Sequence, residues 1–167
     1  AYCEDEFLGS RKKIIINVGR LTEQKNQKLL IKAFYKIADE FEDFNLHIYG
    51  EGELKHELEK LIEELNLKGR VILKGVIPNV IKENRDVRLF VMSSNFEGFP
   101  NTLVEAMANG IPSISTDFNT KSARELFKEE SCGWLVRVND ENDLAEKIKY
   151  VLNNSIISEQ KAKNGIY

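Results

Sequence analysis

Short segments rich in Ile, Val, Leu and Phe alternate with amphipathic helical patterns along the chain. Such runs are typical of strands buried on both faces, because a strand with one wet face shows polar residues at every second position. We therefore predict an α/β domain with a doubly wound, Rossmann-like parallel sheet and helices on both faces. The predicted strands are 12–18, 45–50, 70–75, 87–92, 111–115 and 133–137, and the predicted helices are 26–41, 54–65, 80–84, one after Pro100, and 140–153 with Asp140 as its N-cap.

The two ends of the 167-residue chain do not continue this pattern. We interpret residues 1–12 as a linker or interdomain connection, and residues 13–167 as a single domain with room for a sizeable core. The segment from residue 158, SEQKAKNGIY, shows no closing pattern. The chain is therefore expected to be a piece of a larger protein.

The composition is that of a soluble globular protein, with 42% apolar and 31% charged residues. The formal net charge of −3 argues against a broad binding surface for nucleic acid, and no apolar run has the length of a membrane span. Cys3 and Cys132 form no CxxC pair, and His47 and His56 lie nine residues apart with no Cys or carboxylate at metal-ligand spacing. We expect two reduced thiols and no metal site.

Two polar segments directly follow predicted strands. GRLTEQKN (19–26) comes after the first strand, and NFEGFPNTLVE (95–105) after the fourth. In open α/β sheets, ligands bind beyond the carboxyl ends of the strands where the strand order reverses, and these two strands flank that point in the commonest order. We therefore expect Arg20, Lys25, Glu97 and Glu105 to converge on one crevice.

The turn after Glu97 has the residues of an anion-binding helix start. Gly98 permits close backbone approach, and Pro100 suits the first turn of a helix. The free N–H groups of Asn101, Thr102 and Leu103 are then expected to point out of the helix start, where they and the helix dipole favour a phosphate.

Four charged side chains complete the predicted site. Arg20 offers a planar fork to phosphate oxygens, and Lys25 offers a mobile point charge. Glu97 is expected to hold the hydroxyls of a sugar, and Glu105, expected to be buried one turn into the helix, those of a ribose. Taken singly, each of the four is an ordinary loop or helix-face charge, so the prediction depends on their occurring together. The Gly-Glu-Gly-Glu at 50–53 is interpreted only as a turn.

EGFPNTLVE, with its glutamates eight residues apart, resembles the E-x7-E motif of the retaining GT-B glycosyltransferases of family 4, the glycosyl transferases group 1. VGRLTEQKN is similar to the Gly-Arg-Leu…Lys segment of that family, AMANGIPSISTD to the helix end and strand after its motif, and GWLV to its closing NGxLV. The resemblance covers about residues 13–153. It implies that this chain is the C-terminal, donor-binding half of a GT-B fold, with the N-terminal acceptor domain absent from the chain.

The resemblance also implies roles for single residues. Arg20 and Lys25 would neutralise the donor diphosphate and stabilise the leaving nucleotide, and Glu97 would contact donor-sugar hydroxyls, which makes these three the implied catalytic residues. No Asp-x-Asp is present, in keeping with the metal-independent, cofactor-free transfer that the family implies. The implied donor-binding residues are Gly19, Ile77 at the base, Gly98, Phe99, Pro100, Asn101, Thr102, Leu103 and Glu105 at the ribose.

By the same resemblance, the protein transfers a sugar from a UDP- or GDP-sugar, with retention, to a glycan or lipid-linked acceptor in surface polysaccharide synthesis. We expect it in the cytoplasm, where it could work at the cytoplasmic face of the membrane through its missing domain. The segment 117–133 departs from the family, because Ser122-Ala123 stands where glycines are usual and Glu125-Leu126 replaces Glu-Ile. This departure puts backbone contacts between this loop and the sugar in doubt.

Two alternatives remain beside this interpretation. One is a non-catalytic module of the same fold that binds nucleotide sugars or proteins. The other is a GT-B sugar-nucleotide epimerase, which needs acid–base carboxylates or histidines in the cleft.

Overall fold

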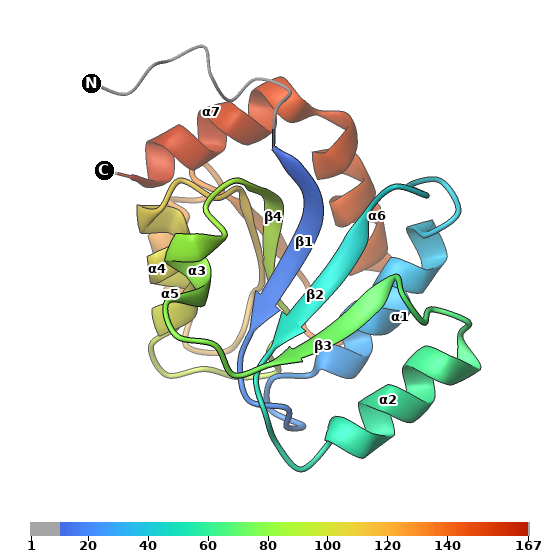
Figure 1. Ribbon diagram of the computed structural model, residues 1–167. Helices are drawn as coiled ribbons and strands as arrows, with labels where there is room; N and C mark the ends of the chain where they lie inside the picture. The colour runs from blue at the N-terminus through green and yellow to red at the C-terminus, as the bar shows by residue number, and fades with distance from the viewer. Residues whose placement is uncertain (1–10, 167) are drawn as a thin grey trace.

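The computed structural model describes residues 11–166, which form a six-stranded sheet with helices on both faces (Figure 1). Every strand pair is parallel, and the order is β3-β2-β1-β4-β5-β6. The doubly wound fold predicted from the sequence is confirmed, including the contact between the first and fourth strands. The strands are β1 (Lys12–Val18), β2 (Asn45–Tyr49), β3 (Val71–Gly75), β4 (Val87–Met92), β5 (Ser113–Thr116) and β6 (Trp134–Val136). The helices are α1 (Gln27–Ile37), α2 (Lys55–Glu64), α3 (Val80–Glu83), α4 (Asn101–Ala108), α5 (Ser122–Leu126), α6 (Glu141–Asn153) and α7 (Ser155–Gly165).

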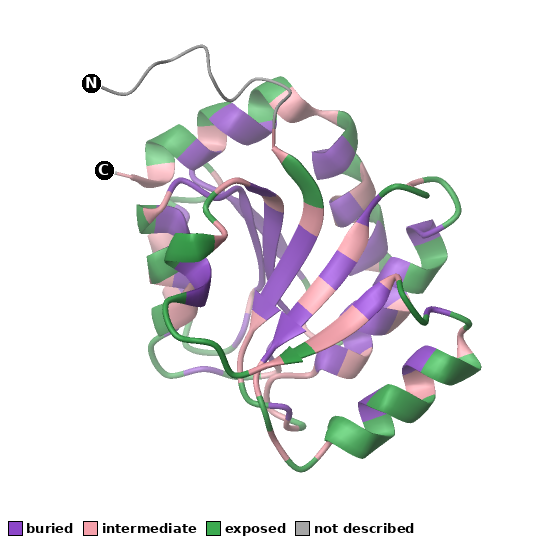
Figure 2. Ribbon diagram, in the orientation of Figure 1, coloured by how far each residue is buried: buried purple, intermediate pink, exposed green. Residues whose placement is uncertain are grey.

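The core lies in two layers, one on each face of the sheet. Consecutive strand residues point to opposite faces, so Ile15 of β1 packs in the layer with α1, α2 and α6, and Ile16 packs in the layer with α3, α4 and α5. Val91 and Phe90 of β4 divide in the same way, and all four side chains are fully buried. Figure 2 shows the resulting pattern, with buried central strands and a more exposed β3 at the sheet edge.

Two boundaries differ from the sequence prediction by more than one residue. Helix α1 ends at Ile37 and not at Phe41, but a turn in which the Phe41 N–H donates to the Ile37 carbonyl still brings the Phe41 ring against the core. Strand β5 begins at Ser113, because Pro112 has no N–H and contributes only its carbonyl, which accepts from Phe90 N–H. The predicted cap of α6 is confirmed, since the Asp140 carboxylate accepts a hydrogen bond from Asp143 N–H.

The sequence prediction misses the short helix α5, and it also misses helix α7. The buried residues of α7 are Ser158, Glu159 and Ala162, so its inward face is small or polar and shows no apolar periodicity. The Arg11 guanidinium donates to the Glu159 carboxylate and to the Gly110 carbonyl, and these contacts hold α7 across the amino end of the sheet (Figure 1).

Strand β1 begins at Lys12, inside the range expected to be a connection, whereas residues 1–10 lie outside the described residues. Of the helices that the structure describes, none combines the length and the apolar character needed to cross a membrane.

Candidate active site

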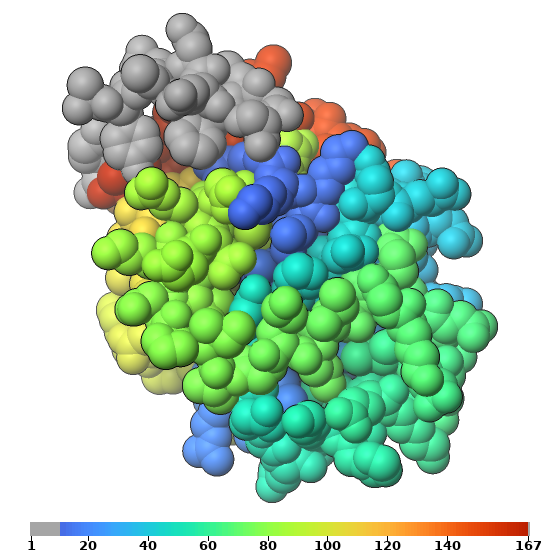
Figure 3. All heavy atoms as spheres, viewed as in Figure 1, coloured from blue at the N-terminus to red at the C-terminus, as the bar shows by residue number. Residues whose placement is uncertain are grey.

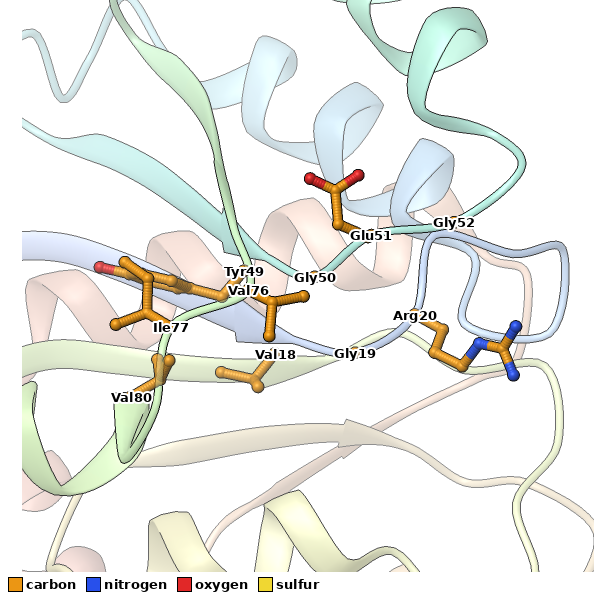
Figure 4. Close-up of a pocket in the computed structure, with 10 residues that line it drawn as sticks. All are labelled: Val18, Gly19, Arg20, Tyr49, Gly50, Glu51, Gly52, Val76, Ile77 and Val80. Atoms are coloured by element: carbon orange, nitrogen blue, oxygen red, sulfur yellow. The ribbon is translucent and has the colours of Figure 1, made fainter.

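An open pocket of about 500 Å³ lies where β1, β2 and β3 end. In Figure 4, the side chains of Val18, Ile77 and Val80 gather at one end of the pocket, and the Arg20 guanidinium lies at the other. Residues of β3, α3 and the loop between them, green in Figure 3, cover the middle of the face seen there. The prediction named Gly19, Arg20 and Ile77, and it missed Val18, Tyr49, Gly50, Glu51, Gly52, Val76 and Val80.

The Gly-Glu-Gly segment at 50–52 has a structural role that its interpretation as a simple turn misses. A Cβ atom on Gly50 would lie 1.9 Å from the Gly19 carbonyl oxygen, and one on Gly52 would lie 2.4 Å from the Leu21 carbonyl oxygen. The Leu21 N–H donates to the Glu51 carbonyl at 3.0 Å. The two glycines therefore let the loops after β1 and β2 touch.

A second group of residues forms where the loop after β1 meets the loop after β4. The Asn95 N–H donates to the Gln24 carbonyl at 2.8 Å, and the Asn95 side-chain amide donates to the Glu23 carbonyl at 2.9 Å. The Ser93 hydroxyl donates to the Lys25 carbonyl at 3.1 Å. These bonds hold the segment that carries Lys25 against the turn that carries the first motif glutamate.

Lys25 and Glu97 form a direct ion pair. Lys25 Nζ lies 2.5 Å from Glu97 Oε1, and their side chains are 25% and 7% exposed. The Ser94 hydroxyl donates to the same Oε1 atom at 2.8 Å. Glu97 Oε2 accepts no hydrogen bond from the residues that the structure describes. The pair thus places a reachable ammonium beside a fixed carboxylate with one oxygen available.

Glu105 lies elsewhere than expected. The prediction that it is buried is wrong, because it lies on the exposed face of α4, together with Asn101. The opposite face, with Leu103, Ala106 and Met107, packs into the core. Glu105 also does not line the pocket.

The start of α4 retains part of the predicted anion site. The Asn101 N–H donates to the Phe99 carbonyl at 3.0 Å, so it is not free as expected. The first helical bond, from an N–H to the carbonyl four residues earlier, is that of Val104 N–H to Pro100, and no described side chain caps the helix. The N–H groups of Thr102 and Leu103 therefore lack an acceptor among the described residues. A Cβ atom on Gly98 would meet nothing within 4 Å, so the space above this glycine is open.

The arrangement can hold a multiply charged anion and an attached polyol. Arg20 and Lys25 provide two cations at the carboxyl edge of the sheet, and the start of α4 adds two amide donors and the positive end of its dipole. Among residues 11–166, no three His, Cys, Asp or Glu side chains group as metal ligands.

A doubly wound sheet with these groups at its carboxyl edge defines a Rossmann-like domain of the class that binds ligands at this edge. Residues 4–166 match the family described as Glycosyl transferases group 1, and the chain belongs to this family. An uncharacterized glycosyltransferase of Methanocaldococcus jannaschii is 44% identical over 117 residues, which cover 70% of this chain and 29% of the relative.

Two further relatives have more specific names. The N-acetylgalactosamine-N,N'-diacetylbacillosaminyl-diphospho-undecaprenol 4-alpha-N-acetylgalactosaminyltransferase of Campylobacter jejuni is 40% identical, over 88% of this chain and 39% of its own length. A crystal structure of a TarM variant of S. aureus, in complex with UDP, alpha-GlcNAc-glycerol and Fondaparinux, superposes with a TM-score of 0.86 at 28% identity, over 93% of this chain and 31% of TarM. The chain thus spans 29%, 39% and 31% of the lengths of these three proteins.

Proposed function

We propose that this chain is the C-terminal, donor-binding domain of a retaining glycosyltransferase that uses a UDP- or GDP-sugar. The whole protein would transfer the sugar to a glycan or lipid-linked acceptor in surface polysaccharide synthesis. The observation that carries the proposal is the ion pair of Lys25 and Glu97, residues 72 positions apart in the chain. It joins a cation suited to phosphate with a carboxylate suited to sugar hydroxyls, beside the pocket that Arg20 lines.

The pocket suits a nucleotide laid along the ends of the strands. Its apolar end, with Val18, Ile77 and Val80, matches the flat face of a base. The diphosphate would then extend past Gly19 toward Arg20 and Lys25. The backbone N–H groups of Thr102 and Leu103 would donate hydrogen bonds to the outer oxygens of the diphosphate.

In the proposed reaction, the groups of the site act on the charge that develops as the nucleotide leaves. Arg20 and Lys25 would stabilise the departing diphosphate, with no metal required for that task. Glu97 Oε2 would accept a hydroxyl of the donor sugar, and Glu105, on the exposed face of α4, would accept the ribose hydroxyls. Front-face attack assisted by the leaving phosphate would retain the configuration of the sugar.

The relatives support parts of this proposal. The TarM variant contains UDP, and the named Campylobacter enzyme acts on an undecaprenol-linked sugar. We therefore favour UDP and a lipid-linked or polymeric acceptor for this chain. Its cytoplasmic location and its missing acceptor domain stay predictions.

The test is calorimetric titration of the chain with UDP, GDP and ADP, beside Arg20→Ala and Glu105→Ala variants. We expect one nucleotide to bind, and each substitution to weaken its binding by roughly tenfold. The matched control is Arg137→Ala, because Arg137 follows β6 at the same edge but pairs with Asp140, away from the pocket. A nucleotide that binds equally well to wild type and to both variants would overturn the proposed site and favour a non-catalytic module.

A further inference from the structure

The loop between β5 and α5, together with Ser122 at the start of α5, contacts the turn between β4 and α4. The Thr120 hydroxyl donates to the Glu97 carbonyl at 3.0 Å, and the Ser122 hydroxyl donates to the Gly98 carbonyl at 3.2 Å. The two hydroxyl oxygens lie 2.9 Å apart. The turn that carries the buried motif glutamate is thus held from outside by two neighbouring hydroxyls.

The loop has its own anchor, independent of those hydroxyls. The Asp117 carboxylate lies 2.6 Å from Arg124 Nη2 and 3.5 Å from Lys121 Nζ, and the Asp117 N–H donates to the Val136 carbonyl at 2.8 Å. Burial alone would raise the pKa of Asp117, but the hydrogen bonds and charges of Arg124 and Lys121 together lower it. The lowered pKa favours the ionised form of Asp117, and the contacts of Asp117 with Arg124, Lys121 and Val136 involve neither hydroxyl.

The two hydroxyls also determine which groups the turn can offer to a ligand. They carry two hydrogens, and each hydroxyl donates one to a carbonyl of the turn. The carbonyls of Glu97 and Gly98 thus each accept a hydrogen bond from the loop side, and the amide donors of the turn and Glu97 Oε2 remain for a ligand. Gly98 lies at the centre of this surface, with open space above it.

We propose that Thr120 and Ser122 are positioning residues for the donor sugar. They fix the backbone of Glu97 and Gly98, and through it the carboxylate that receives the sugar hydroxyls. This inference rests on the proposed function. In this inference, the loop holds the turn at the sugar end of the donor, away from the diphosphate. Its Ser122-Ala123 stands where the resemblance to the family leads us to expect glycines.

The first test compares binding of UDP with binding of UDP-glucose, UDP-galactose and their N-acetylated forms by the whole chain. Thr120→Val and Ser122→Ala should weaken the preferred UDP-sugar by roughly three- to tenfold and change UDP binding by less than about twofold. Thr120→Ser should restore wild-type binding. Ser131→Ala is the matched control, because the Ser131 hydroxyl of the same segment bonds to the Phe127 carbonyl and not to the turn.

The outcomes separate the inference from the proposed function. If wild type and Thr120→Val prefer the UDP-sugar equally, or if Thr120→Val loses UDP as strongly as UDP-sugar, the positioning role is overturned and the nucleotide site stands. If wild type binds GDP in place of UDP, the same comparison is made with GDP and GDP-sugars. If wild type binds neither UDP nor GDP nor their sugars, the donor site itself fails.

A second measurement tests the positioning itself and needs no ligand. Hydrogen exchange of the segment 95–103 should become faster in Thr120→Val than in wild type, while exchange of α6 stays the same. Unchanged exchange in 95–103 would overturn the inference, because the hydroxyl would then not fix the turn.

Discussion

At the scale of single residues, the two motif glutamates have exchanged the environments that their positions suggested. Glu97 precedes a Gly-Phe-Pro turn and is buried, whereas Glu105 belongs to a regular helix and is exposed. The buried carboxylate is tolerated because Lys25 and Ser94 both bond to it. Its ion pair is therefore a feature of the ligand-free fold as well as of the proposed site.

The strength of this pair can be measured with Lys25→Met, Glu97→Gln and the double variant. Lys25→Met leaves a carboxylate that is 7% exposed with Ser94 as its hydrogen-bond donor, so unfolding should become easier. The double variant should lose less stability than the two single effects combined, with a coupling energy of about 0.5–3 kcal/mol. Urea unfolding of the four proteins gives this value, and additive effects would contradict it.

His47 of β2 gives the fold a pH-dependent stability. Burial lowers the pKa of His47 from its ordinary value of 6.5, and the charge of Lys74 lowers it further. The folded chain therefore binds this proton less readily than the unfolded chain. Its contribution to stability is present above 6.5 and is lost as the pH falls from there toward the lower folded pKa.

Urea unfolding at about pH 7.5 and about pH 5.5 should show the lower stability at the acid value. His47→Gln should reduce this difference. His56→Gln is the control, since the His56 side chain is 96% exposed and should leave the difference unchanged. A His47→Gln protein with the full wild-type pH dependence would refute this assignment.

At the scale of the elements, an added methyl group should lower the stability of the chain at one loop glycine and leave it nearly unchanged at another. Gly52→Ala places Cβ 2.4 Å from a backbone oxygen, so it should destabilise the chain by about 1–3 kcal/mol. Gly98→Ala meets open space and should change stability by less than about 0.5 kcal/mol. If a ligand approaches the Gly98 backbone as proposed, this same variant should lose nucleotide-sugar affinity.

Thermal unfolding and UDP-sugar titration of the two variants provide both readouts. A stable Gly52→Ala protein would show that the loops after β1 and β2 can move apart. Undiminished UDP-sugar binding by Gly98→Ala would show that the ligand does not lie against this turn.

The elements also show what the sequence could and could not predict. All six strands were predicted because strands buried on both faces read as continuous apolar runs, and their order brought Lys25 and Glu97 together as expected. Helix α7 was missed because its buried face is Ser158, Glu159 and Ala162. The burial of Glu105 was wrong because spacing along a helix does not say how the helix is rotated against the sheet. The role of Gly50 and Gly52 depends on the distance between two loops, which no local pattern contains.

At the scale of the whole molecule, the pocket and the Lys25–Glu97 pair lie at the carboxyl ends of the strands, and α7 lies across the amino ends. The chain spans 29% and 39% of two of its relatives. If the chain is the donor-binding half of a larger enzyme, as proposed, the purified chain should bind its nucleotide weakly and transfer little or no sugar. Sugar transfer to added acceptors, measured beside a longer form of the protein, tests this. Efficient transfer by the chain alone would contradict the domain assignment.

The Lys25 ammonium, held beside Glu97, is only 25% exposed. Dissolved salt would therefore screen its attraction for a diphosphate less than it screens that of a fully exposed cation. The guanidinium of Arg20 is exposed, so its attraction for phosphate is screened as ionic strength rises. If both cations bind the nucleotide as proposed, the contribution of Arg20 to its affinity should fall as salt rises, and that of Lys25 should fall less.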